Sequence, residues 1–322
     1  MIEYSVVIRT TGKAKEKYQR LLDSIAKLEP QPQEVIVVLP EGYNLPDERL
    51  GWETYYFSPK GMVIQRMIGI QNCRTKYALI CDDDVCFSSD FVEKLYQPLK
   101  GDGYGFSAGP LYSFLPPKGV NAVLCTIMAS ATPTVFHKDR YVTVLRSGGY
   151  SYNRNLKPKE YYETQSVAWT CFFADIDAIK SIDFDAESWL DSHGYSSLDD
   201  QTMFYKAWLR GIKTVVVSDA CYEHLDGKTS VRNNKEPVLF SLAYNRVVFW
   251  HRFVYEQQCN LIQKLWTWLC FKYRSLWLWL FDVMDLARHR LTKQDFKIKR
   301  KGVSEARKFV KSLEYHELPP VV

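Results

Sequence analysis

The sequence predicts an α/β fold in which helices flank a mostly parallel central sheet, with a helical extension at the C-terminus. In the first 81 residues, short apolar runs alternate with longer segments of helical periodicity. The apolar runs are continuous, as in strands that are buried on both faces of a sheet. Their order, strand, helix, strand, strand, helix, strand, is that of a parallel sheet covered by helices. From residue 236 almost to the end, the pattern is helical.

The individual elements follow from the same periodicity. A helix over 14–28 has its apolar side chains on one face, and a second helix is expected over 62–73. The strands of the first part are expected at 4–8, 34–39, 52–57 and 77–81. Further on we expect short strands within 120–128 and 140–145, a polar loop over 146–166, a strand over 166–173, a helix over 198–210 and a strand over 212–217.

The composition is that of an ordinary globular protein, with 46% hydrophobic and 25% charged residues. The net charge of +5 is uneven, because residues 288–311 hold ten Lys or Arg and two Asp or Glu, which leaves −3 for the other 298 residues. The eight cysteines form no C-x-x-C pair, so we expect reduced thiols and not a disulfide frame or a zinc site. The N-terminus enters a strand without a secretory signal pattern, which favours a cytoplasmic protein.

Three consecutive aspartates, Asp82, Asp83 and Asp84, directly follow the strand at 77–81. Open α/β sheets bind ligands at the carboxyl ends of their strands. Mg²⁺ and Mn²⁺ take carboxylate ligands together with substrate phosphates. Asp82 and Asp84 are therefore suited to hold a metal ion that also binds a diphosphate. Asp83 would then face a ribose or the backbone. The alternative is a turn whose carboxylates cap the next helix.

Three other positions carry a functional and a structural interpretation each. Asp199 and Asp200 precede an amphipathic run that ends at Gly211, so they either cap a helix or supply a general base. His224 follows the strand at 212–217 and is either a metal ligand or a surface histidine. Arg66 either contacts a donor phosphate or points from its helix into water.

Taken in chain order, these segments resemble the family 2 glycosyltransferases, inverting enzymes of the GT-A fold. The resemblance covers most of the chain and is carried by residues 5–11, 58–70, 80–85, 168–173, 199–211, 224–230 and 244–252. It implies that 80–85 contains the metal-binding D-x-D motif and that Asp200, beside Asp199, is the catalytic base. His224, with Gly227 and Ser230, is similar to the late metal-facing histidine and its loop.

The resemblance also implies cofactors, partners and domains. A nucleotide-diphosphate sugar, with UDP-sugars favoured, would be the donor, Mn²⁺ or Mg²⁺ the cofactor, and a glycan or a lipid-linked molecule of cell-surface polysaccharide synthesis the acceptor. The catalytic domain would span 1–235, with a nucleotide-sugar half at 1–110 and an acceptor half at 111–235, before an extension at 236–322. Its donor contacts would come from Arg9, Thr10, Glu41, Arg66, Asp82 and Asp83.

Two departures from the family pattern affect the nucleoside end of the donor site. Arg9 stands where the family usually has proline, and the usual acidic pair after the second strand is missing. Only Glu41, shifted along the chain, remains to contact the nucleoside. This change leaves open a non-catalytic membrane-associated scaffold, although intact Asp82, Asp84 and Asp200 argue against it. A nucleotidyltransferase is the other alternative, but residues 10–15 resemble its phosphate loop only faintly.

The extension is rich in tryptophan and basic residues. Its uninterrupted apolar run, 275–281, is far shorter than the roughly 20 residues that span a bilayer. Tryptophans flanked by Lys and Arg are typical of a helix that lies in a membrane interface, and each basic residue adds about 1 kcal/mol near an anionic leaflet. We therefore expect peripheral binding to the cytoplasmic face of the inner membrane, or else a helix packed on the catalytic domain. Nucleic acid is not an expected partner.

Overall fold

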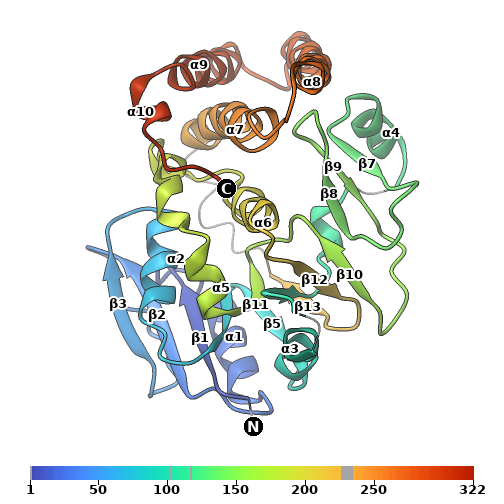
Figure 1. Ribbon diagram of the computed structural model, residues 1–322. Coiled ribbons are helices and arrows are strands. Elements are labelled where there is room, and N and C mark those ends of the chain that lie inside the picture. Colours follow the sequence, from blue (N-terminus) through green and yellow to red (C-terminus); the bar gives the residue numbers. More distant parts are fainter. Residues whose placement is uncertain (1, 102, 117, 226–234) are drawn as a thin grey trace.

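A computed structural model describes residues 2–101, 103–116, 118–225 and 235–322 and confirms the α/β class. The central sheet has eight strands in the order β10-β12-β6-β11-β4-β1-β2-β3 (Figure 1). In chain order these are β1 (Tyr4–Arg9), β2 (Glu34–Pro40), β3 (Thr54–Ser58), β4 (Tyr77–Asp82), β6 (Phe106–Ala108), β10 (Tyr161–Thr164), β11 (Cys171–Asp175) and β12 (Thr214–Val217).

Strand direction places the ends of β1 and β4 side by side. β1 pairs in parallel with β2 and with β4, and Arg9 lies opposite Asp82 in the register. β11 is antiparallel to both of its neighbours, β4 and β6, while β12 is parallel to β6. Because parallel strands end at the same edge, the residues after β1 and β4 share one edge of the sheet.

Helices cover both faces of the sheet, as the continuous apolar strands predict. Alternate strand residues such as Val6 and Ile8 pack with α1 (Glu16–Ala26) and α3 (Phe91–Gly101). Val7, which points the other way, packs with α2 (Met62–Gln71), α5 (Ile176–Ser181) and α6 (Asp199–Leu209). The result is a sheet between two helical layers with a hydrophobic core on each face.

The segment after β6 differs from expectation in two places. Residues 120–128 were expected to form a strand, but they hold the helix α4 (Val120–Ile127), which lies near a small sheet of β7 (Ala131–Pro133), β8 (Val142–Val144) and β9 (Tyr150–Tyr152). The expected loop over 146–166 contains β9 and β10. Apolar residues fill almost all of 120–128, so the run has no polar face to reveal its period.

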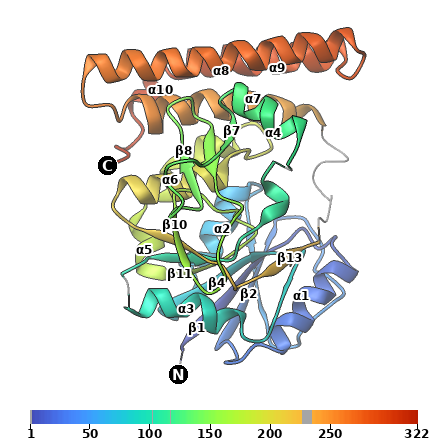
Figure 2. The same cartoon turned by 90° about the vertical axis from the view of Figure 1, so that its right-hand side faces the viewer.

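The C-terminal part is helical, as expected. Figure 2 shows α8 (Leu261–Ala287) and α9 (Lys293–Phe309) lying across α7 (Lys235–Phe249), on the side away from the N-terminus. A π-helical turn at Trp250–Tyr255 continues α7, and α10 (Leu313–His316) precedes the C-terminus. Among the described residues, no helix is long and apolar enough to cross a membrane.

A buried ionic cluster joins the C-terminal part to the sheet domain. The carboxylate of Glu187, which is fully buried, accepts hydrogen bonds from Lys206 Nζ at 2.8 Å and from Arg252 Nε at 2.9 Å. Arg252 also donates to the carbonyl of Pro319 at 2.7 Å. Lys206 and Arg252 come from α6 and from the π-helical turn, so a single carboxylate connects elements far apart in the sequence.

Candidate active site

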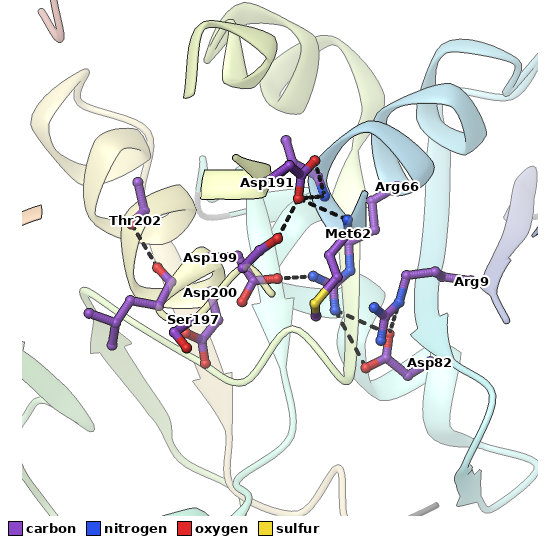
Figure 3. A network of polar contacts seen from close by, with 12 residues as sticks. Arg9, Met62, Arg66, Asp82, Asp191, Ser197, Asp199, Asp200 and Thr202 are labelled. Carbon is purple, nitrogen blue, oxygen red and sulfur yellow. Dashed lines mark hydrogen bonds and ion pairs between the residues drawn. The ribbon is translucent and has the colours of Figure 1, made fainter. Parts of the chain in front are cut away.

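Two arginines draw together carboxylates from β4 and α6 at the shared strand edge (Figure 3). Arg66 Nη2 lies 3.1 Å from Asp82 Oδ1, and Arg66 Nη1 donates to Asp199. Arg9 Nε lies 3.1 Å from the same oxygen of Asp82. Burial alone would lower the pKa of Arg9, but the charges of Asp82, Asp199 and Asp83 raise it above the ordinary value. The Arg9 guanidinium is therefore a fixed cation at the end of the sheet.

The position of Arg66 depends on how α2 is held. Asp191 accepts hydrogen bonds from the first backbone N–H groups of α2, including Met62 N at 2.9 Å, and so caps the helix from the end of a distant 3-10 helix, Phe184–Asp191. Gly61 permits this contact, because a Cβ atom there would lie 2.5 Å from Asp191 Oδ2. The Arg66 guanidinium also lies over the ring of Trp169 at 4.5 Å. A sequence pattern gives no sign of Asp191, which acts across 129 residues.

Asp83 points to the other side of the strand end, toward the residue after β1. Its Oδ2 atom accepts a hydrogen bond from Thr10 Oγ1 at 2.5 Å. Burial raises the pKa of Asp83 to about 6, and the charge of Asp84 adds to the rise, while the bond from Thr10 opposes it. Thr10 and Asp83 were expected to contact the donor, and here they form a polar pair beside the Arg9–Asp82 contact.

A two-stranded sheet brings His224 beside Asp84. β5 (Val85–Phe87) pairs with β13 (Tyr222–His224), with His224 opposite Val85. His224 Nε2 lies 3.3 Å from Asp84 Oδ1, and the backbone N–H of Leu225 donates to the carbonyl of Asp84 at 2.7 Å. Both side chains are largely buried. A carboxylate and an imidazole at this separation suit a divalent cation that takes its remaining ligands from phosphate and water.

Asp200, the second residue of α6, reaches a different part of the site. Burial raises the pKa of Asp200 to about 7, and the charge of Asp199 adds to this rise. The backbone N–H of Gln201, which donates to Asp200 Oδ1 at 2.7 Å, and the charge of Arg66 oppose it. A carboxylate with a pKa near neutrality is suited to take and release a proton under physiological conditions.

Asp200 lines a cavity of about 160 Å³ whose other walls are mainly apolar and aromatic. These walls include Phe114, Tyr141, Tyr150 and Val167. Phe114 also contacts the His224 ring edge-on, with 5.4 Å between ring centroids, so the cavity approaches the Asp84–His224 pair. A small polar molecule in this cavity would meet one carboxylate surrounded by aromatic surfaces.

The structure separates two aspartates that were expected to act together. Asp82 is held by Arg9 and Arg66, whereas Asp84 faces His224. Asp199 contacts Arg66 and so joins Arg9, Arg66 and Asp82 in one group, the arginine cluster. Asp200 instead lines the cavity. Among the described residues, no cluster of three or more His, Cys, Asp or Glu side chains forms a metal site by itself.

The remaining expected positions have separate outcomes. Glu41 is exposed just after β2, so it lies at the same sheet edge, and its role stays a prediction. Gly227 and Ser230 fall outside the described residues. Trp169, which lies under the Arg66 guanidinium, is buried in the core.

A family model described as glycosyl transferase family 2 matches residues 45–175. The structure is also similar to GalNAc-T7, crystallised with UDP, GalNAc and Mn²⁺, at a TM-score of 0.52 and 14% identity. That similarity covers 90% of this chain and 58% of GalNAc-T7, so the chain spans less than two thirds of that protein. The chain thus contains a segment, residues 45–175, that is similar to the family 2 glycosyltransferases.

Its fold is GT-A, with the central sheet and flanking helices described above. S. aureus TarS 1–349 is a further similar structure, at a TM-score of 0.45 and 14% identity, over 95% of this chain and 92% of TarS. No curated protein matches the sequence significantly. The region matched to the family contains Arg66, the three aspartates and Trp169 but ends before α6. The case for Asp200 and His224 therefore rests on geometry alone.

Proposed function

We propose that the protein is a metal-dependent inverting glycosyltransferase that moves a sugar from a nucleotide diphosphate to a hydroxyl of a glycan or a lipid-linked acceptor. The observation that carries this proposal is the Asp84–His224 pair at the end of β4, with Asp200 in a separate cavity nearby. UDP and Mn²⁺ in the structure of GalNAc-T7 support a UDP-sugar as the donor. Cell-surface polysaccharide synthesis at the cytoplasmic face of the membrane is the setting we propose.

At the donor end, Asp84 and His224 would hold Mn²⁺ or Mg²⁺. The bound ion supplies a Lewis acid that neutralises the charge of the leaving diphosphate. Asp82 holds the guanidinium groups of Arg9 and Arg66 in place, and these cations lie at the same strand edge. Thr10 and Asp83 offer a hydroxyl and a carboxylate for the ribose, and Glu41 remains the candidate for the base.

At the acceptor end, Asp200 would act as the general base. The acceptor hydroxyl oxygen attacks the anomeric carbon while the bond from that carbon to the diphosphate oxygen breaks. The hydroxyl proton passes to Asp200, and a single displacement inverts the anomeric centre. The aromatic walls around Asp200 offer flat surfaces for a sugar ring.

The pH dependence of transfer follows from the raised pKa of Asp200. The base is active only when ionised, so the rate should rise as the pH passes through about 7 and level off above it. An unperturbed aspartate would give this rise near pH 4. Initial rates of nucleoside diphosphate release across this range measure the effect. A rate that is flat between pH 5 and 8 would contradict the role of Asp200.

Replacing Asp84 by alanine should remove metal-dependent donor binding. We expect the donor affinity measured with Mn²⁺ to fall by about 100-fold or more, because even outer-shell partners of a metal ligand are worth about 10- to 100-fold. Isothermal titration with a nucleotide sugar, with and without Mn²⁺, measures it. Glu223→Ala is the matched control, because Glu223 lies in the same strand as His224 but is exposed and contacts Arg20. Equal affinity in Asp84→Ala and in the control would refute the metal site.

A further inference from the structure

The helices of the extension enclose a groove. α9 packs closely on α7 at Gly302, where a Cβ atom would lie 2.6 Å from the carbonyl oxygen of Phe240. α8 stands apart from this pair and leaves a groove of about 640 Å³ between α7, α8 and α9. Val247, Phe271 and Leu278 give the groove an apolar lining. A groove of this size admits part of an apolar chain as well as a small polar group.

The charged side chains of the groove have one sign. Among the described residues that line it, none is acidic, and six are basic: Arg246, Lys272, Arg300, Arg307, Lys308 and Lys311. Asp282 is the nearby carboxylate, and it is already bonded to Lys299 and Arg300. Burial lowers the pKa of Arg246, and the charge of Arg300 lowers it further against the opposing effect of Asp282. The groove therefore has an unbalanced positive charge that favours an anion.

One face of α8 is unusually apolar for a surface. Among the described residues, half of the exposed large hydrophobic side chains belong to this helix, and they include three tryptophans. They are Leu261, Ile262, Leu265, Trp266, Trp268, Leu269, Tyr273, Leu276, Trp279, Val283 and Met284. α8 lies at the outer side of the molecule, away from the central sheet (Figure 2). Exposed apolar surfaces of this extent mark interaction sites on soluble domains.

The apolar face and the groove are continuous. Leu276 and Trp279 are exposed on α8 and also line the groove, 54% and 40% accessible respectively. The same surface thus combines tryptophans, aliphatic side chains and an opening rimmed by cations. A helix with tryptophan and leucine on one face and basic residues beside it is typical of a helix that lies in the plane of a membrane interface.

We propose that the exposed face of α8 and the adjoining groove bind the surface of an anionic lipid bilayer. The apolar side chains of α8 enter the boundary between headgroups and acyl chains, and a lipid phosphate lies among the cations of the groove. The charge of the groove selects an anionic bilayer over a neutral one. Because binding needs neither donor nor metal, this inference is independent of the proposed transfer chemistry.

Flotation of the full chain with lipid vesicles tests this surface. We expect the protein to float with vesicles that contain phosphatidylglycerol and to bind vesicles of phosphatidylcholine alone much more weakly. The double variant Leu265→Gln, Trp266→Gln should lose flotation. The double variant Arg307→Gln, Lys311→Gln should weaken it by about 25-fold, at about fivefold for each charge removed near an anionic leaflet.

Matched controls distinguish binding through this surface from non-specific hydrophobic or electrostatic binding to vesicles. Val135→Gln with Phe136→Gln removes two exposed apolar side chains outside α8, and Lys27→Gln with Lys100→Gln removes two exposed charges outside the groove. Both controls should float like the unchanged protein. Equal binding to both kinds of vesicle, or flotation unchanged by the α8 variant, would overturn the proposal. A dimer in solution that this variant separates, without vesicle binding, would instead make the surface an interface between two copies.

Discussion

Replacing Asp200 by asparagine is expected to reduce sugar transfer by about 10²- to 10⁴-fold, the usual contribution of a general base. Asparagine keeps the size of the side chain but cannot accept the acceptor proton. Donor binding should persist, because Asp84, His224 and the arginine cluster are unchanged. Metal-dependent release of nucleoside diphosphate measures the rate, and calorimetric titration measures donor affinity in the same preparation.

The same substitution should make the protein more stable above pH 7. The pKa of Asp200 is about 7 in the folded protein and near 3.9 when unfolded, so the folded state holds more protons in between. Stability therefore falls as the pH rises through that interval, and the asparagine variant avoids the loss. Asp185→Asn, an exposed position away from the cavity, is the control and should change neither rate nor donor affinity. A fully active Asp200→Asn variant would rule out the assignment.

Replacing Glu187 by alanine should have the largest effect on stability, about 3–5 kcal/mol, because it leaves buried cations without their partner. Burial would raise the pKa of Glu187, yet its bonds from Arg252 and the charge of Lys206 lower it, so the carboxylate remains ionised. The side chains of both Glu187 and Lys206 are fully buried. Urea denaturation monitored by circular dichroism measures the change in the free energy of unfolding.

A surface ion pair provides the comparison for Glu187. Glu160 pairs with Lys157 at 3.4 Å, and both side chains are exposed. Glu160→Ala should cost no more than about 1 kcal/mol, the usual limit for such pairs. If Glu187→Ala were as stable as Glu160→Ala, the buried cluster would not be what joins α6 to the C-terminal helices.

Much of the fold follows from local patterns in the sequence. The strands β1, β2 and β4 are continuous apolar runs, and α1 has a regular apolar face, so periodicity locates them to within a few residues. α4 was wrongly expected to be a strand because its residues are nearly all apolar and lack a polar face. The small strands β9 and β10 lie in a polar, tyrosine-rich stretch in which pairing partners, and not propensity, decide the structure.

One part of the candidate site was predictable from the sequence, because the aspartate motif coincides with the end of the strand β4. Because the three aspartates stand at the end of β4, next to β1, they share an edge of the sheet with Arg9 and Thr10. The different partners of Asp82 and Asp84 were not predictable from the sequence. They depend on Arg66 reaching Asp82 and on β13 placing His224 beside Asp84. The roles of Asp191 and Glu187 are not predictable from the sequence for the same reason, since their partners lie far away in the chain.

The thermal stability of the unchanged protein with a panel of nucleotide sugars, with and without Mn²⁺, shows directly whether the protein has a metal-dependent donor site. A donor at about 100 times its dissociation constant stabilises the folded state by roughly 2.7 kcal/mol. We expect at least one nucleotide-diphosphate sugar to raise the unfolding temperature, and we expect this rise only when the metal is present. If no donor shifts the unfolding temperature in the presence of Mn²⁺ or Mg²⁺, the Asp84–His224 pair does not form a donor site and the proposed transfer is wrong.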